Sequence, residues 1–394
     1  MLAEDPGKGN WRFRKTVCWT SQRDSYTIWH ESAGLIYHKG SLMKQQALDF
    51  LRELMSAPTP SGFEQPGQKV VREYLSHYCD EVRTDVHGNV IGVRNPNGKP
   101  KVMLAGHVDE IGFMIEYITD EGYIRFVPIG GVDPALLPGQ RVAIHADRGV
   151  VRGVIGKKPI HLADKEEKPD KLRVHQLWID IGAGNKKDAK KYVAVGDPIT
   201  FDVPFELLKN RLAASRGFDD KVGGFVVAET MRLIVGKKIQ PAVYCVSTVQ
   251  EEIGARGAHT SAFGIEPDVG IAADVDHASD YPGADKALVG DIRLGKGPVL
   301  HRGASINPVL GKMLISAAKK NKIPYQMSAE PGVTRTDTDA IFLTRAGVAS
   351  ALLSIPNRYM HTPVEVVSLD DLENGAKLLA SFLAGMGNRV SFIP

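Results

Sequence analysis

Two adjacent glutamates, Glu251 and Glu252, end an apolar run that reads PAVYCVSTVQEE. Like charges held close together repel one another, and burying an unpaired carboxylate costs several kcal/mol. An exposed turn at the end of a strand would explain the pair simply, because most charged side chains lie in water. A catalytic site that needs two carboxylates is the alternative explanation.

Other acidic and imidazole side chains follow predicted strands or stand directly before a predicted helix. Each has an ordinary structural explanation: Asp219 as a helix cap, Asp274 as a turn residue, His107 as a hydrogen-bonded core histidine. In open α/β sheets, however, ligands bind beyond the carboxyl ends of the strands, so these residues would meet in one crevice. The residues at such element ends are His107 and Asp109, Asp219 and Asp220, Glu251 and Glu252, Asp274, Asp276 and His277, and His361.

So many carboxylates in one crevice need a compensating cation, because they cannot otherwise ionise together. Two histidines and three carboxylates without cysteine suit Zn²⁺, Co²⁺ or Mn²⁺. One bridging carboxylate with two further ligands on each ion would hold two metals about 3.5–4 Å apart, with a shared water of lowered pKa. Adjacent residues of an extended chain point in opposite directions, so one glutamate can bind metal while its neighbour takes a proton from that water.

The elements that must position these residues alternate between helix and strand. Helical spacing of Leu48, Leu51 and Met55 predicts a helix that ends before Pro58, and Ser61 with Glu64 predicts a capping box for the next helix. Strand-like runs at 89–94, 101–107, 242–249, 268–275 and 349–355 alternate with helices at 221–235, 255–263, 307–321 and from 369. We therefore expect a doubly wound α/β fold with a mostly parallel sheet.

The α/β pattern is interrupted by a segment of different character. Residues 112–203 are dense in glycine and β-branched residues with frequent turn signals, which indicates a small β-barrel or sandwich. The predicted organisation is thus a catalytic domain from 43–111 and 204–394 with an inserted β domain at 112–203. Residues 1–42 show no sustained periodicity, and we expect a disordered tail or residues upstream of the start that the cell uses.

Composition narrows the class of protein. The 394 residues are 43% hydrophobic and 24% charged, as in globular proteins, and the net charge is only +3, which argues against a nucleic acid or an anionic membrane as partner. Three scattered cysteines make neither a disulfide framework nor a cysteine zinc site. Without a long apolar run or a signal-peptide pattern, the sequence predicts a cytoplasmic protein.

Five motifs in order along residues 43–394 resemble one known family. GHVDEIG, FDDKVG, VQEEIGARGA, AADVDH and SIPNRYMHTPVEVV are similar to the motifs of the dinuclear-metal TET aminopeptidases, metallopeptidase family forty-two. Members of that family have also been labelled glutamyl aminopeptidase, deblocking aminopeptidase and cellulase M, an endoglucanase. The resemblance implies a zinc-peptidase-like catalytic domain with an inserted β-barrel.

The resemblance also implies a role for each matching residue. Glu251 would be the general base, and Asp109 would orient His107. The Thr-Asp-rich segment TRTDTDAIFLTRAG would line the substrate pocket through Asp337 or Asp339. Spacing alone does not separate Asp219 from Asp220, and the choice of Asp219 as the bridge follows the family pattern. The implied ligands of two divalent ions, Zn²⁺, Co²⁺ or Mn²⁺, are His107, Asp219, Glu252, Asp274 and His361.

The expected function is removal of N-terminal residues from peptides by a metal-dependent aminopeptidase. An N-acyl amino acid deacylase on the same metal site is the nearest alternative. An endoglucanase is a less favoured alternative, because it would need two carboxylates and no metal. A non-catalytic assembly protein, also less favoured, would need none of the predicted ligands or the base. The resemblance implies a homo-oligomer in which the β insertion forms dimers and the dimers assemble into a tetrahedral dodecamer.

Overall fold

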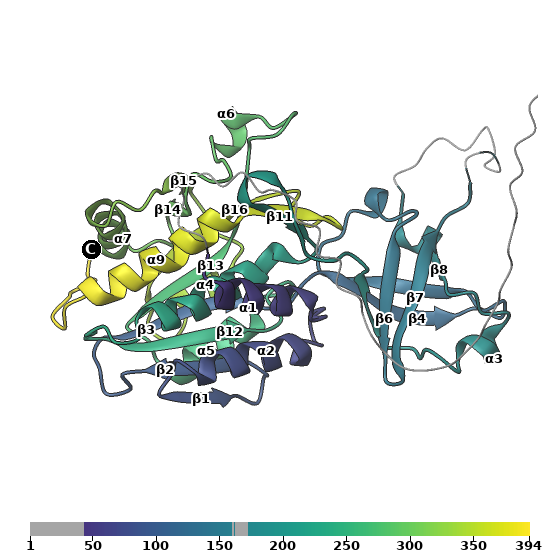
Figure 1. The fold of residues 1–394 in the computed structure, drawn as a ribbon, viewed down its shortest axis with the longest axis horizontal. Helices are drawn as coiled ribbons and strands as arrows, with labels where there is room; N and C mark the ends of the chain where they lie inside the picture. Colours follow the sequence, from purple (N-terminus) through teal and green to yellow (C-terminus); the bar gives the residue numbers. More distant parts are fainter. Residues whose placement is uncertain (1–42, 160, 162–171) are drawn as a thin grey trace, which may run out of the picture. The chain divides into compact units, whose positions relative to one another are not determined.

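The computed structural model describes residues 43–159, 161 and 172–394 (Figure 1). The predicted extension at 1–42 lies outside the described residues. Within them, every helix is too short or too polar to cross a membrane. The model confirms the predicted α/β class with an inserted β-barrel.

A large mixed sheet forms the frame of the α/β part. Its strands are β1 (Glu81–Thr84), β2 (Val90–Arg94), β3 (Lys101–His107), β10 (Glu206–Leu207), β11 (Leu212–Ser215), β12 (Ala242–Thr248), β13 (Val269–His277), β14 (Val299–Gly303), β15 (Gln326–Glu330), β16 (Ala349–Arg358) and β17 (Glu365–Ser368). The order is β1-β2-β12-β3-β13-β16-β17-β11-β10, with β14 between β16 and β15. Parallel pairing joins β12, β3, β13 and β16 at the centre and β14 with β15. The other strand pairs are antiparallel, so the sheet is mixed and not mostly parallel.

Register within the parallel strands brings their carboxyl ends to one edge. Thr248, the last residue of β12, pairs with His107, the last residue of β3. On the other side of β3, Ala272 of β13 pairs with Ala105, two residues before each strand reaches Asp274 and His107. The predicted convergence of strand ends is therefore a consequence of the register.

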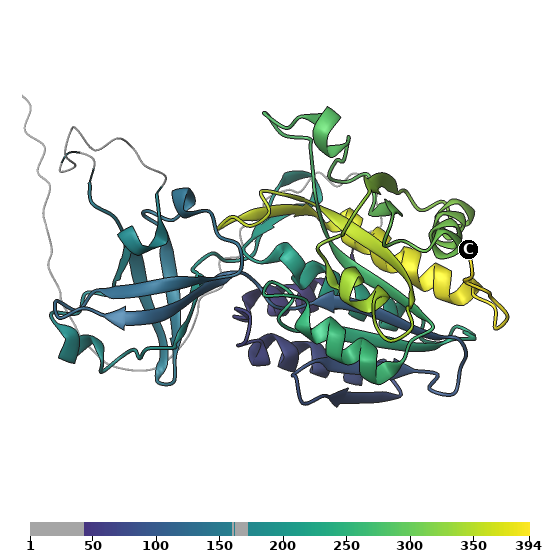
Figure 2. The same cartoon turned by 180° about the vertical axis from the view of Figure 1, so that it is seen from behind.

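Helices cover both faces of this sheet because its central strands are apolar on both sides. In β3, Val102 and Leu104 join the core beneath one group of helices, while Met103 and Ala105 join the core on the other face. The first group is α1 (Gln45–Ser56), α2 (Gln65–Ser76), α4 (Phe218–Leu233), α7 (Pro308–Lys320) and α9 (Leu369–Gly385). The face seen from behind in Figure 2 carries α5 (Arg256–Ile265) and α8 (Asp337–Phe342). Two short helices, α3 (Lys186–Ala189) and α6 (Lys286–Val289), lie in connections.

The insertion is a closed antiparallel barrel with its own core. Its strands are β4 (Gly112–Ile118), β5 (Ile124–Ile129), β6 (Arg141–Ala146), β7 (Gly149–Gly156), β8 (Trp178–Asp180) and β9 (Pro198–Phe201), in the order β4-β5-β8-β7-β6-β9. The ring of Phe113 packs edge-on against Phe126 and Phe201, with centroids 5.0 and 5.3 Å away. The turn-rich, β-branched sequence of the insertion thus corresponds to a barrel with its own core.

The predicted capping box is wrong. Helix α2 begins at Gln65 with no side-chain cap. The Ser61 hydroxyl donates instead to Asp109 Oδ2 at 2.7 Å, and Glu64 accepts from the backbone N–H of Gly62 and of Gln250. The local pattern assigned both side chains to the start of the helix. Instead, Ser61 contacts Asp109 and Glu64 contacts Gln250, and both partners are distant in sequence.

Candidate metal centre and active site

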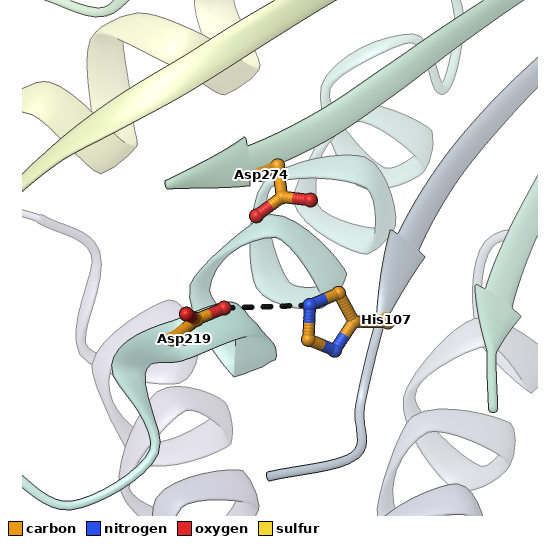
Figure 3. Close-up of side chains that lie close together, drawn as sticks. All are labelled: His107, Asp219 and Asp274. Carbon is orange, nitrogen blue, oxygen red and sulfur yellow. Dashed lines mark ion pairs between the residues drawn. The ribbon is translucent and has the colours of Figure 1, made fainter. Parts of the chain in front are cut away.

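His107 is held at the end of β3 by groups on both sides of its ring. The residue is buried, and its Nδ1 lies 3.1 Å from the Asp109 carbonyl oxygen and 3.4 Å from Asp109 Oδ1. Its Nε2 faces Asp219 Oδ1 at 3.4 Å (Figure 3). An acceptor on Nδ1 leaves Nε2 free to be a metal ligand, the arrangement typical of ligating histidines.

Asp219 and Asp220 point to different places. Asp219 directs Oδ1 toward His107 and Oδ2 toward His361 Nε2, 3.2 Å away. Asp220 is fully buried, and its two oxygens accept from the backbone N–H of His107 and of Gly223. The geometry therefore places Asp219, and not Asp220, between the two histidines.

Two groups of three residues offer ligand atoms within 4.8 Å of one another, and Asp219 belongs to both. The first group adds His107 and Asp274, which lies near the end of β13 (Figure 3). The second adds Glu252 and His361, whose Oε2 and Nε2 are 3.5 Å apart. The structure thus brings together all five side chains predicted as metal ligands.

The adjacent glutamates diverge at a turn rather than along an extended strand. Strand β12 stops at Thr248, Gln250 takes a left-handed conformation with φ 58°, and the backbone N–H groups of Gly254 and Ala255 return to the Glu251 carbonyl. Glu251 Oε2 then lies 3.8 Å from His107 Nε2, while Glu252 faces His361. The predicted divergence is present, and its cause is the turn.

Asp109 contacts His107, and its carboxylate also holds the turn that carries the two glutamates. Its Oδ1 accepts from the backbone N–H of Glu251 at 3.0 Å and its Oδ2 from that of Glu252 at 3.2 Å. Burial would raise the pKa of Asp109, but His107 and the donated hydrogen bonds together lower it. An ionised Asp109 therefore fits its surroundings.

For the other buried acids of the cluster, nearby positive charge and hydrogen bonds do not offset the effect of burial on the pKa. Burial raises the pKa of Asp274 to about 8 and that of Glu251 to about 10, and it raises the pKa of Glu252 well above its usual value. Glu252 Oε1 is also buried without a hydrogen-bond partner. Divalent cations would supply the missing positive charge and a partner for that oxygen, so the donor set fits a hard-to-borderline metal.

A cavity of about 750 Å³ opens over this cluster. Asp339 lines it, although both Asp339 oxygens also accept from the backbone N–H groups of Thr334 and Arg335. Asp337 is buried beneath and accepts from the Thr248 hydroxyl. Of the two aspartates predicted to line the substrate pocket, only Asp339 thus reaches the cavity wall.

Comparison with known proteins assigns the family. The model of the M42 glutamyl aminopeptidases matches residues 88–378. The chain belongs to this family. A lysyl aminopeptidase of Pyrococcus furiosus is 36% identical over 338 residues, 85% of this chain and 96% of that protein. The solved TET aminopeptidase of a marine-sediment Thaumarchaeota archaeon superposes with a TM-score of 0.83 at 37% identity, covering 86% of this chain and 96% of that one.

This M42 chain is accordingly an aminopeptidase, a hydrolase acting on peptides. The TET1 peptidase of Pyrococcus horikoshii, 31% identical with a TM-score of 0.77, covers 86% of this chain and 100% of that chain. That protein can assemble into a tetrahedron or a large octahedral shell.

Three side chains that contact this cluster were not among the predicted site residues. Ser61 donates to Asp109, Glu64 accepts from the backbone of Gln250, and Glu365 accepts from the backbone N–H groups of Asp219 and His361. Ser61 and Glu64 matched a local capping pattern, which hid their distant partners. Glu365 follows His361 by four residues, and an acidic residue so near a predicted ligand could have indicated its role.

Proposed function

We propose that this aminopeptidase is metal-dependent and holds two divalent cations, one at His107, Asp219 and Asp274 and the other at Asp219, Glu252 and His361. The observation that carries the proposal is the position of Asp219, whose two oxygens face different histidines. Each group then has three protein donors and leaves room for water and substrate, as catalytic sites require. The residues suit Zn²⁺, Co²⁺ or Mn²⁺.

Cations bound there would polarise the scissile carbonyl and lower the pKa of a water between them. Glu251 is the general base: its carboxylate accepts a proton from the attacking water and passes it to the leaving amine nitrogen. Glu251 Oε2 lies 3.8 Å from His107 Nε2, which places the carboxylate beside the first group of proposed ligands. Asp109 keeps Glu251 over the cluster through the backbone N–H at 3.0 Å.

Acidic side chains on the cavity wall would favour substrates with a positive charge at the N-terminal residue. Asp276 and Glu330 line the cavity together with Arg335, and Asp276 Oδ2 is buried without a hydrogen-bond partner. The name of the Pyrococcus furiosus relative, a lysyl aminopeptidase, agrees with this preference. We therefore propose that peptides beginning with lysine or arginine are cleaved faster than those beginning with glutamate, and that Asp276→Asn reduces the ratio.

A substrate panel tests these proposals together. Aminoacyl-p-nitroanilides with free or acetylated N-termini are given to metal-stripped protein, then again after addition of Zn²⁺, Co²⁺ or Mn²⁺. Cleavage of free-amine substrates only after metal addition is the expected result. Cleavage of acetylated substrates would instead indicate a deacylase, and full activity of the stripped protein would contradict metal dependence.

We also propose that the barrel mediates assembly into homo-oligomers, as dimers within a dodecamer. Val150 and Val154 on β7 are 55% and 46% exposed, and Tyr192 and Val195 add further exposed apolar surface to the same domain. Burying such surface against a second copy would be favourable. Light scattering on the eluted protein should give twelve times the 42.9 kDa chain mass, and Val154→Asp should lower it.

A further inference from the structure

Glu365 lies beneath the metal cluster at the first position of β17. Its side chain is buried, with 1% of the residue exposed. Oε2 accepts from the backbone N–H of Asp219 at 2.9 Å, and Oε1 accepts from the backbone N–H of His361 at 3.1 Å. One carboxylate thus contacts the main chain of two residues whose side chains meet in the site.

Strand β11 pairs with β17, with Ser215 opposite Glu365, but Asp219 and His361 themselves lie outside that pairing. Asp219 stands at the non-helical start of α4, and His361 lies in the turn between β16 and β17. In that turn Tyr359 and His361 both have positive φ, 66° and 59°, a conformation that non-glycine residues rarely adopt. Surrounding contacts have to maintain such a backbone, and the hydrogen bond to Glu365 is one of them.

Only a side chain with two acceptor oxygens and this reach can serve both N–H groups. An amide of the same length has a single acceptor and would point its own N–H at one of them. A shorter carboxylate would not span both donors from the same backbone position.

Asp109 occupies the corresponding position on the other side of the cluster. It accepts from the backbone N–H groups of Glu251 and Glu252 with its two oxygens. The same chemistry, one buried carboxylate on two backbone donors, thus appears under both halves of the site.

Resting on the proposed two-metal function, we infer that Glu365 is a positioning residue that sets the distance between the Asp219 and His361 side chains for the second cation. Asp219 Oδ2 and His361 Nε2 lie 3.2 Å apart, close enough to share one ligand sphere. Release of either backbone would let these donors separate. Loss of Glu365 should therefore weaken the cation at Asp219, Glu252 and His361 most, because Glu365 holds the backbone of two of its three ligands. The other cation shares only Asp219 with that group and should be affected less.

The test is a Co²⁺ titration of metal-stripped full-length chain, followed by visible absorption and calorimetry. Glu365→Gln keeps size and removes one acceptor, and Glu365→Asp keeps the charge and removes the reach. Asp371→Asn is the matched control: Asp371 is equally buried, accepts from the backbone N–H of Gly295 and Gly297 at 2.7 Å, and does not line the site cavity.

We expect two Co²⁺ ions on the unaltered chain. Both Glu365 variants should bind the second ion at least about tenfold more weakly, the effect typical of groups that orient metal ligands. Asp371→Asn should lower the melting temperature but leave both affinities unchanged. Unaltered Co²⁺ affinities in Glu365→Gln, with a melting temperature lowered as in Asp371→Asn, would overturn the inference while leaving the proposed function intact. No Co²⁺ binding by the unaltered chain would overturn both.

Discussion

Glu251 and Glu252 serve two halves of one cluster although they are neighbours in sequence. Glu251 lies toward His107 and Glu252 toward His361, and Asp109 fixes the main chain of both. Repulsion between the two is tolerable only with positive charge nearby, which the proposed cations would supply. Their separate directions make their roles separable by substitution.

Glu251→Gln tests the proposed base directly. The amide cannot accept the proton of the attacking water, so kcat should fall by about 10²–10⁴-fold. Co²⁺ affinity should stay the same, because Glu251 belongs to neither ligand group. Steady-state rates and metal content measured on one preparation check both statements. A variant with near-normal turnover would show that another group takes the proton.

At the scale of elements, the loop after β5 of the barrel lies against two of the proposed metal ligands. A Cβ built on Gly131 would lie 3.0 Å from His361 Nδ1, and one on Gly130 would lie 3.1 Å from Glu252 Oε2. These contacts are tighter than ordinary van der Waals packing. The glycines therefore let barrel backbone lie against two of the proposed ligands.

Gly131→Ala should disturb the His361 ring without unfolding the barrel. The added methyl group forces the ring to shift by a few tenths of an ångström, and we expect about a tenfold loss of Co²⁺ affinity or kcat. Gly184→Ala is the control, because a Cβ there meets nothing within 4 Å. Equal behaviour of the two variants would mean that the ring adapts freely.

Strand β14 carries a buried histidine that should make the protein acid-sensitive. His301 is 6% exposed, lies 2.9 Å from the Ser354 hydroxyl and 3.9 Å from Asp276 Oδ2, and burial lowers its pKa to about 4. The unfolded chain binds this proton near pH 6.5. Its stabilising contribution is therefore complete above pH 6.5 and is lost as the pH falls toward 4.

Between pH 7 and pH 5 this loss amounts to about 2 kcal/mol. His301→Gln removes the titrating group and should make the melting temperature less dependent on pH across that window. The same substitution at His259, which is exposed on α5, serves as the control. An unchanged pH profile in His301→Gln would assign the acid sensitivity to other groups.

At the scale of the whole molecule, metal should contribute to stability as well as to activity. The ligands come from β3, α4, β13, the turn after β12 and the turn after β16, so bound cations would cross-link much of the α/β part. Anything that binds only the folded chain stabilises it, by about 4 kcal/mol at 1,000 times its Kd. Stripping the metal should lower the melting temperature, and Zn²⁺ or Co²⁺ should restore it; an equal melting temperature would contradict this.

Much of the fold and site was predictable because the signals are local. Apolar runs such as 101–107 and 242–249 mark buried strands, and β3 and β12 follow them closely. Parallel strands deliver their carboxyl ends to one edge, so His107 and Asp274 could be placed together before their contacts were known. Turn density likewise separated the barrel from the α/β part.

Tertiary structure alone decided which side chains contact one another. Asp219 and Asp220 are equivalent in sequence, and their opposite directions depend on His107, His361 and Glu365, all distant along the chain. Ser61 satisfied a helix-capping pattern but donates to Asp109. Short-range sequence specifies helix, strand and turn, because those depend on neighbouring residues. The partner of a polar side chain depends on which distant segments packing brings within hydrogen-bonding distance.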